Sequence, residues 1–205
     1  MSQGTPSGTG PNTWAAFALA FYGKTYNDQH AIDAANEVTQ WVINKLYDPT
    51  NGGVWGGICH PFKEKPGDHH KGDTRFPFKS TEQVIDTWHL LRIMGYDSNP
   101  ERVAEWLTTD GKGWVEPEKR FAAGTNWEDF QDKSRFLDPQ SWGSIVANMI
   151  SEPDQVNGAI EDAEKYLLIG DVIVDGQKIS GFSDRDLSDE PKIIWYGGTA
   201  QMIVA

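Results

Sequence analysis

Residues 81–95 have the sequence TEQVIDTWHLLRIMG, and residues 100–109, which follow a short polar turn, have the sequence PERVAEWLTT. The first segment is densely apolar, which is typical of a helix that is buried on most of its faces. The second has apolar residues at intervals of three and four with charged residues between them, which is typical of an amphipathic helix at a surface. The two segments together predict a helical hairpin with an inner and an outer helix.

The same alternation occurs on both sides of this hairpin. Apolar segments at 12–22 and 139–150 are each followed by an amphipathic segment, at 29–46 and 157–168 respectively. A seventh apolar segment, IIWYGGTAQMIVA, occupies residues 193–205. A unit that recurs at roughly sixty-residue intervals is typical of stacked helical hairpins, which curl into a solenoid or a toroid and gather their loops at one end.

This pattern predicts an all-α fold of the (α/α)-toroid type. We expect residues 12–205 to form the toroid domain, with three hairpins and a seventh helix, after a flexible segment over residues 1–11. The strongest competing strand signal is the short run VIV at 172–174. No cap, glycine or lysine closes the last helix, so we expect the chain to be an incomplete part of a toroid of six hairpins.

Composition and charge exclude several classes of protein. The net charge of −12 argues against a nucleic-acid partner, which would require a basic patch. No run reaches the ~18 apolar residues of a membrane span, and the polar start MSQGTPSGTG does not resemble a signal peptide. The single cysteine, Cys59, excludes an internal disulfide and a cysteine zinc cluster. We expect no metal or cofactor, no membrane partner, and a cytoplasmic location by default.

Tryptophan is enriched in this chain. There are nine tryptophans, and three of them, Trp55, Trp114 and Trp127, lie in segments that we expect to be loops. Aromatic side chains in loops provide flat apolar surfaces on which ligands, including sugars, can stack. The alternative is that they fill the top of the toroid, and the sequence does not decide between the two.

Five motifs in this order resemble a known family. They are NTWAAFALA at 12–20, YDPTNGG at 47–53, STEQVID at 80–86, LDPQSW at 137–142 and WYGGTAQM at 195–202. The sequence is similar to the six-hairpin glycosidase superfamily, and in particular to a group of bacterial glycosidase-like proteins with the patterns S-T-E-H-N-[IL]-D, L-D-x-Q-[TS]-W and W-x-E-G-T-A-Q-M. The resemblance implies an (α/α) toroid with a carbohydrate-binding cleft at the end where the inner helices begin.

The chain departs from this pattern at two places. The histidine–asparagine pair of the first pattern is replaced by Gln83 and Val84, and the glutamate of the last pattern is replaced by Gly197. If that glutamate is an acid–base group in the family, this chain lacks it. Whether the chain is an enzyme is therefore left open by the sequence.

Three carboxylates remain as candidate catalytic groups: Glu82, Asp86 and Asp138. Glu82 and Asp86 are four residues apart, so they share one face of a helix. Glycoside hydrolysis uses two carboxylates, which lie about 6.5–9.5 Å apart in inverting enzymes. This separation suits residues on neighbouring inner helices, so Glu82 and Asp138 are the preferred pair. A helix N-terminus stabilises negative charge, which favours Asp138 as the base and Glu82 or Asp86 as the acid.

Each carboxylate also has a purely structural interpretation. Asp138 before Pro139 fits a helix N-cap followed by a proline at the first helical position. Glu82 fits a first-turn acid that interacts with the helix dipole. Asp86 lies among apolar residues, where an unpaired carboxylate is costly to bury, so it requires a partner or a cleft. The residues that we expect to bind substrate are Trp55, Trp88, Trp114, Trp127, Trp142, Trp195 and Gln140.

The leading hypothesis is a carbohydrate-active, glycoside-hydrolase-like toroid that binds a glycan in a tryptophan-lined cleft. One alternative is a glycan-binding or scaffold module without catalysis, which is consistent with Gly197. Another is a sugar epimerase or polysaccharide lyase, with His89 or Tyr196 as the base. The apolar flank of residues 193–205 further predicts self-association or docking with a missing C-terminal half.

Overall fold

The computed structural model describes residues 7–59, 74–126, 128–186 and 193–205. The chain divides into two compact units, residues 1–105 (unit 1) and residues 106–205 (unit 2). Over the described residues, no helix is both long enough and apolar enough to cross a bilayer.

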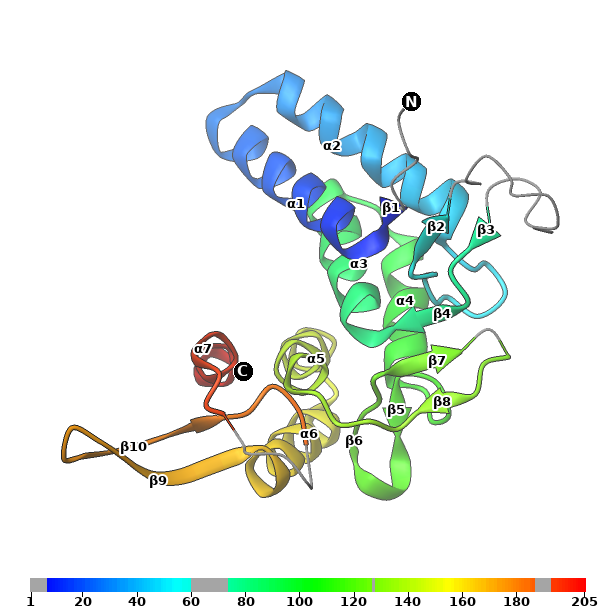
Figure 1. Ribbon diagram of the computed structural model, residues 1–205. Coiled ribbons are helices and arrows are strands. Elements are labelled where there is room, and N and C mark those ends of the chain that lie inside the picture. The colour runs from blue at the N-terminus through cyan, green and yellow to red at the C-terminus, as the bar shows by residue number, and fades with distance from the viewer. Residues whose placement is uncertain (1–6, 60–73, 127, 187–192) are drawn as a thin grey trace, which may run out of the picture. The chain divides into compact units, whose positions relative to one another are not determined.

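Unit 1 is built mainly from helices (Figure 1). The helix α1 contacts both α2 and α3, and a short antiparallel sheet of order β1-β2-β3 lies at the start of α1. The elements are β1 (Ser7–Gly8), α1 (Thr9–Tyr26), α2 (Gln29–Trp41), a π-helical turn η1 (Val42–Leu46), β2 (Gly57–Cys59), β3 (Thr74–Arg75), β4 (Phe78–Ser80), α3 (Thr81–Met94) and α4 (Ser98–Thr108), whose last three residues belong to unit 2.

The turn between α1 and α2 shows why the sequence forms this hairpin. Asn27 adopts the left-handed conformation (φ 55°) that ends a helix, and Asp28 caps α2 by accepting hydrogen bonds from the backbone of His30 and Ala31. The two helices approach closely at Gly23, where an added Cβ would lie 2.7 Å from Cγ1 of Ile32. Small residues on the facing sides of both helices permit this approach.

Unit 2 combines three helices with short antiparallel strands. The helix α5 contacts α6 and α7, and Leu137, Ala163 and Leu167 form a buried cluster against which Trp195 packs. The elements are β5 (Trp114–Val115), a 3-10 turn η2 (Glu116–Glu118), β6 (Arg120–Phe121), β7 (Gly124–Asn126), β8 (Gln131–Asp132), α5 (Leu137–Met149), α6 (Pro153–Tyr166), β9 (Leu168–Val174), β10 (Gln177–Phe182) and α7 (Tyr196–Val204).

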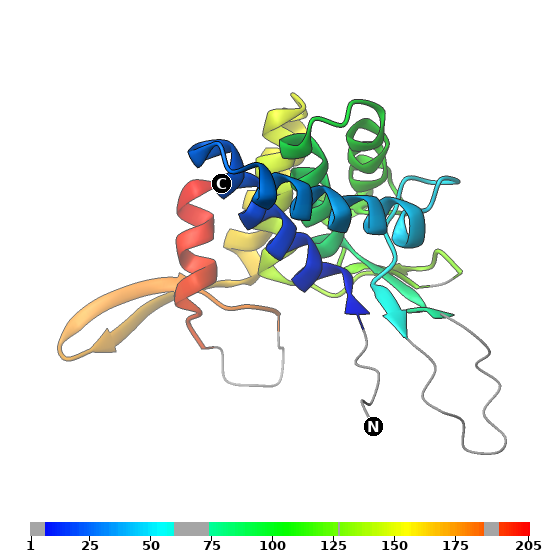
Figure 2. The same cartoon turned by 90° about the horizontal axis from the view of Figure 1, so that it is seen from above.

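The inner and outer helices match the expected order, but the expectation of a purely α-helical chain is wrong. In addition to the short strands, the structure has a long antiparallel hairpin, β9–β10, which extends away from α6 in both views (Figures 1 and 2). Asp175 and Gly176 connect its strands with φ values of 50° and 78°. A two-residue turn with two positive φ values is the turn that matches the twist of a β-hairpin.

Candidate functional site

Glu82 and Asp86 lie on the first turns of α3 in unit 1. Their spacing places them on one face of the helix, and His89 continues this face. Glu82 is exposed, whereas Asp86 is only 8% exposed. The structure thus confirms the helical placement of these residues, and Ser80 is the N-cap of α3, although its side chain makes no capping hydrogen bond.

His89 is half-buried next to two aromatic side chains. The centre of its ring lies 5.0 Å from the ring centre of Trp88 and 6.4 Å from the ring centre of Phe17 on α1. Burial lowers the pKa of His89, so its imidazole is neutral at pH 7. Its Nε2 atom is buried and has no hydrogen-bond partner among the described residues. Tyr196, the other base considered for an epimerase or lyase, is 77% exposed at the start of α7.

Asp138 lies in the first turn of α5 in unit 2. The N-cap of this helix is Phe136 and no side chain caps it, so the interpretation of Asp138 as the N-cap is wrong, and Pro139 is the third helical residue instead of the first. Asp138 is half-buried, and its Oδ1 atom is buried without a hydrogen-bond partner in the described part of the chain. Capping therefore does not account for this carboxyl group.

The surroundings of Asp138 come from three segments of unit 2. The side chain of Ser141 donates a hydrogen bond of 3.0 Å to Oε1 of Gln201 on α7. The backbone N–H of Leu137 donates one of 2.8 Å to the carbonyl of Asp184. Burial raises the pKa of Asp138, a hydrogen bond with Gln201 opposes this, and the negative charge of Asp184 raises it further. The net result is a carboxyl group that retains its proton to a higher pH than an exposed aspartate.

The structure describes five of the six tryptophans that we expected to bind substrate, and these five fall into two groups. Trp55, Trp142 and Trp195 are half-buried. Trp88 and Trp114 are each only 2% exposed and belong to the interior. Trp127 lies outside the described residues.

Gln140 is fully buried, and its side chain forms hydrogen bonds with the backbone. Its Oε1 accepts a hydrogen bond of 2.9 Å from the N–H of Phe121, and its Nε2 donates one of 2.8 Å to the carbonyl of the same residue. This pairing joins α5 to β6 and accounts for Gln140 without a ligand.

Two residues near Asp138, Gln201 and Asp184, were not predicted as site residues. Gln201 belongs to the quoted motif at 195–202, so its presence beside the site could have been inferred from the motif. The position of Asp184 near Asp138 could not have been inferred in this way, because Asp184 lies in the loop that follows β10. Glu82 and Asp86 belong to unit 1 and Asp138 to unit 2, so the pairing of these carboxylates across a substrate stays a prediction.

Comparison with known proteins gives structural matches only. No family model and no curated protein matches the sequence. The solved structure of a glycoside hydrolase family 76 (mannosidase), Bt3792 from Bacteroides thetaiotaomicron VPI-5482, matches with a TM-score of 0.58 and 11% identity over 88% of this chain and 50% of that chain. The Lin0763 protein from Listeria innocua matches with a TM-score of 0.56 and 16% identity over 96% of this chain and 53% of that chain.

This chain therefore spans about half the length of these two solved chains. At such low identities the likeness concerns the fold and not the chemistry. What the chain shares with these two structures is an (α/α)-toroid fold over about half of their length.

Proposed function

We propose that this chain is a carbohydrate-active protein of the glycoside-hydrolase type, in which Asp138 is the general acid. The observation that carries the proposal is the half-buried carboxyl group of Asp138. Its Oδ1 atom is buried and accepts no hydrogen bond from any described residue. Glycoside hydrolysis needs a carboxylic acid that stays protonated long enough to protonate the leaving oxygen. The raised pKa of Asp138 supports this role.

This assignment reverses the one suggested by the helix N-terminus. The dipole of α5 favours a charged carboxylate, which suits a base. Burial and the charge of Asp184 act in the opposite direction, and together they raise the pKa. With Asp138 as the acid, the role of base is left to the other two carboxylates predicted from the sequence, Glu82 and Asp86.

Mannose-containing glycans are the first substrates to test. One solved structure of this fold is that of a mannosidase. Half-buried indole rings at Trp55, Trp142 and Trp195 offer apolar surfaces for sugar rings. The two solved chains are about twice as long as the part of them that this chain matches. We therefore propose activity on a glycan for the whole protein.

A second function is favoured by Gly197, where the family pattern has a glutamate. A protein that keeps the glycan-binding surface but lacks one carboxylate would bind glycans without cleaving them. Gly197 is exposed in the first turn of α7, so its position is open to solvent in the described structure.

A panel of neutral polysaccharides distinguishes the two functions. The full chain is incubated with mannan, β-glucan and starch, while released reducing sugar and calorimetric binding are measured in parallel. We expect cleavage of a mannose-containing glycan. Binding without cleavage would support the binding module instead, and neither binding nor cleavage would refute both functions.

Returning the missing carboxylate provides a second test. The variant Gly197→Glu is expected to raise the cleavage rate by about 10²-fold, the lower end of the usual acid–base contributions. A Cβ at this position would lie 3.2 Å from Nε1 of Trp195, so the indole ring must shift slightly. Gly170→Glu is the matched control, because no atom lies within 4 Å of its added Cβ. Equal rates for wild type and Gly197→Glu would show that a carboxylate at residue 197 contributes nothing.

A further inference from the structure

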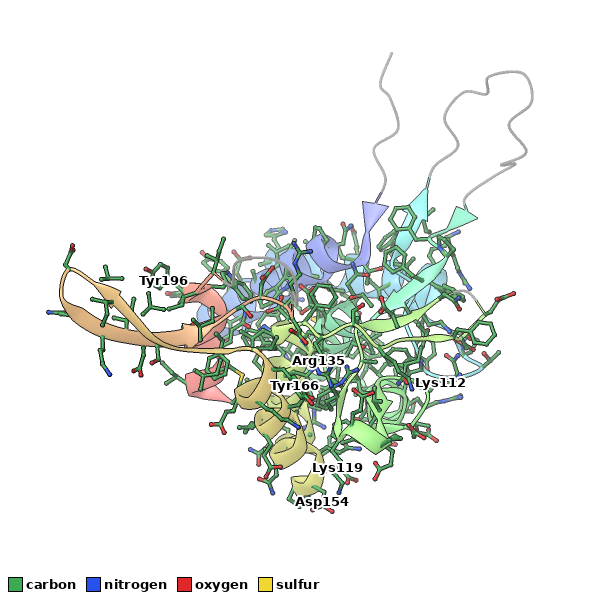
Figure 3. The ribbon with its side chains drawn as sticks, turned by 60° about the horizontal axis from the view of Figure 1, so that its bottom comes forward. Lys112, Lys119, Arg135, Asp154, Tyr166 and Tyr196 are labelled. Atoms are coloured by element: carbon green, nitrogen blue, oxygen red, sulfur yellow. The ribbon has the colours of Figure 1, made fainter. Side chains whose placement is uncertain are left out.

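Unit 2 contains a cavity of about 400 Å³ between the turn at residues 117–119 and the helix α6. Asp138 is not among its lining residues, so the cavity is separate from the site described above. In Figure 3 the labelled Lys119 and Arg135 lie beside α6, and the labelled Tyr166 is the last residue of this helix. The charged side chains that line it are Glu118, Lys119, Arg135, Glu161, Asp162 and Lys165.

The shape of this cavity is fixed by close backbone packing. A Cβ added to Gly158 of α6 would lie 2.5 Å from the carbonyl oxygen of Lys119, so the turn and the helix are in direct contact. Lys119 has a positive φ of 49°, and its N–H donates a hydrogen bond of 3.2 Å to the carbonyl of Glu116. The turn is thus held in one conformation against α6.

Two of the acidic side chains are already engaged by arginines. Arg120 is 1% exposed and donates a hydrogen bond of 2.8 Å to Glu118, whose pKa it lowers. Arg135 donates from Nε to both oxygens of Asp162 at 3.2 Å and from Nη2 to Glu118 at 2.8 Å. Its guanidinium carbon lies 4.0 Å above the centre of the Tyr166 ring. Arg135 is therefore held rigidly, and its Nη1 has no hydrogen-bond partner among the described residues.

The two lysines of the cavity have no acidic partner in the part of the chain that the structure describes. Neither Lys119 nor Lys165 forms an ion pair within residues 7–59, 74–126, 128–186 and 193–205, and Lys165 Nζ lies 4.8 Å from the ring centre of Tyr166. Glu161 is the remaining carboxylate of the lining. The six charged side chains that line the cavity balance, with three cations and three carboxylates. The buried Arg120 lies outside the lining and pairs with Glu118 and Asp162, so it adds one positive charge to the surroundings of the cavity.

We propose that this cavity binds the carboxylate or phosphate group of a small anionic ligand about the size of a monosaccharide, held by Lys119, Lys165 and the Nη1 edge of Arg135. A volume of about 400 Å³ is larger than a single oxyanion needs and lies within the range of small-molecule sites. The guanidinium group of Arg135 is already fixed in place, which lowers the entropy cost of binding an anion there. Lys119 and Lys165 are exposed, so their ammonium groups can turn toward a bound anion. The proposal does not depend on glycan cleavage at Asp138.

Calorimetric titration of the full chain at low ionic strength tests this site. The probes are glucose 6-phosphate, glucuronate, inorganic phosphate and, as the uncharged reference, glucose. We expect the charged sugars to bind and glucose not to bind. If inorganic phosphate binds as tightly as glucose 6-phosphate, the site recognises the anion alone. If inorganic phosphate binds more weakly, the sugar ring contributes to binding. Either result supports the site.

A double variant assigns the binding to this cavity. Lys119→Met with Lys165→Met keeps the aliphatic stems and is expected to weaken binding of glucose 6-phosphate about tenfold or more. Lys178→Met is the matched control, because Lys178 is 70% exposed and pairs with Asp171 on the β9–β10 hairpin. Raising the salt to about 1 M should weaken wild-type binding through screening.

Three outcomes would refute the anion site. They are a double variant that binds within twofold of the wild type, glucose binding as tightly as the charged probes, and no binding of any probe at millimolar concentration. Asp138→Asn should leave anion binding unchanged, so failure of the proposed hydrolase function and failure of this site can be told apart.

Discussion

Replacing Asp138 by asparagine is expected to lower the rate of glycan cleavage by about 10²–10⁴-fold, the usual contribution of general acid catalysis. Asparagine has the same shape and keeps a hydrogen-bonding group toward Gln201, but it cannot donate a proton to the leaving oxygen. Binding of the uncleaved glycan should change by no more than a few-fold. The rate is measured with the mannose-containing glycan that the wild type cleaves fastest, and a loss smaller than tenfold would exclude Asp138 as the acid.

The pH dependence of stability provides an independent readout for the same variant. Because the pKa of Asp138 is raised in the folded state, the folded protein binds a proton that the unfolded chain has already lost between the ordinary and the raised pKa. The free energy of unfolding of the wild type therefore falls as the pH rises through this window. Asp138→Asn removes this dependence.

At neutral pH the variant should be at least as stable as the wild type, and below the ordinary aspartate pKa of about 3.9 the two should converge. Urea unfolding at several pH values measures this. A variant that is clearly less stable than the wild type at pH 7 would indicate that the charged carboxylate has a structural role.

Removing the charge of Asp184 tests whether the pKa of Asp138 sets the pH dependence of activity. Asp184 raises the pKa of Asp138, so Asp184→Asn should lower this pKa and move the loss of activity at high pH toward lower pH. A purely structural effect of Asp184 would lower the rate equally at every pH.

The helices could be predicted from the sequence because their apolar periodicity is long and regular. The segment predicted at 81–95 corresponds to α3 (Thr81–Met94), and Gly95 ends it with a positive φ of 81°. The segment predicted at 29–46 is α2 followed by the π-helical turn, a change in winding that leaves the apolar pattern intact. Such features are encoded within a few consecutive residues.

The β9–β10 hairpin was missed although its turn is present in the sequence. Asp175 and Gly176 follow the run VIV, and an Asp-Gly pair directly after a β-branched run is a strong hairpin signal. The predicted outer helix at 157–168 was extended to Leu168, where β9 begins, two residues after α6 ends at Tyr166. Giving the turn chemistry more weight than the helical pattern would have found the hairpin.

The charged network of unit 2 could not be predicted in the same way. Arg120 and Arg135 meet Asp162 only because β6, the segment before α5 and α6 come together in the fold. No local spacing encodes this meeting. The buried Oδ1 of Asp138 is likewise a property of packing, because the sequence allowed both a catalytic carboxylate and a helix cap at this position.

Gly52→Ala is expected to reduce the free energy of unfolding by about 2–5 kcal/mol, the sum of a left-handed conformation for alanine and a steric clash. Gly52 has a φ of 84°, and its added Cβ would lie 2.2 Å from the carbonyl oxygen of Arg102 on α4. This turn is held on both sides: the N–H of Gly52 donates to the carbonyl of Asp48 at 2.8 Å, and Asp48 pairs with the buried Lys79 at 2.8 Å. The turn therefore cannot move away from α4 without breaking these contacts.

Gly111→Ala separates the two contributions to this loss. Gly111 has nearly the same φ, 80°, but no atom lies within 4 Å of its added Cβ. This control should lose only the conformational part, about 1–2 kcal/mol. Urea unfolding of both variants gives the comparison directly. If Gly52→Ala lost no more than Gly111→Ala, the glycine-rich loop would not pack against α4 through residue 52, and the close approach at Arg102 would be wrong.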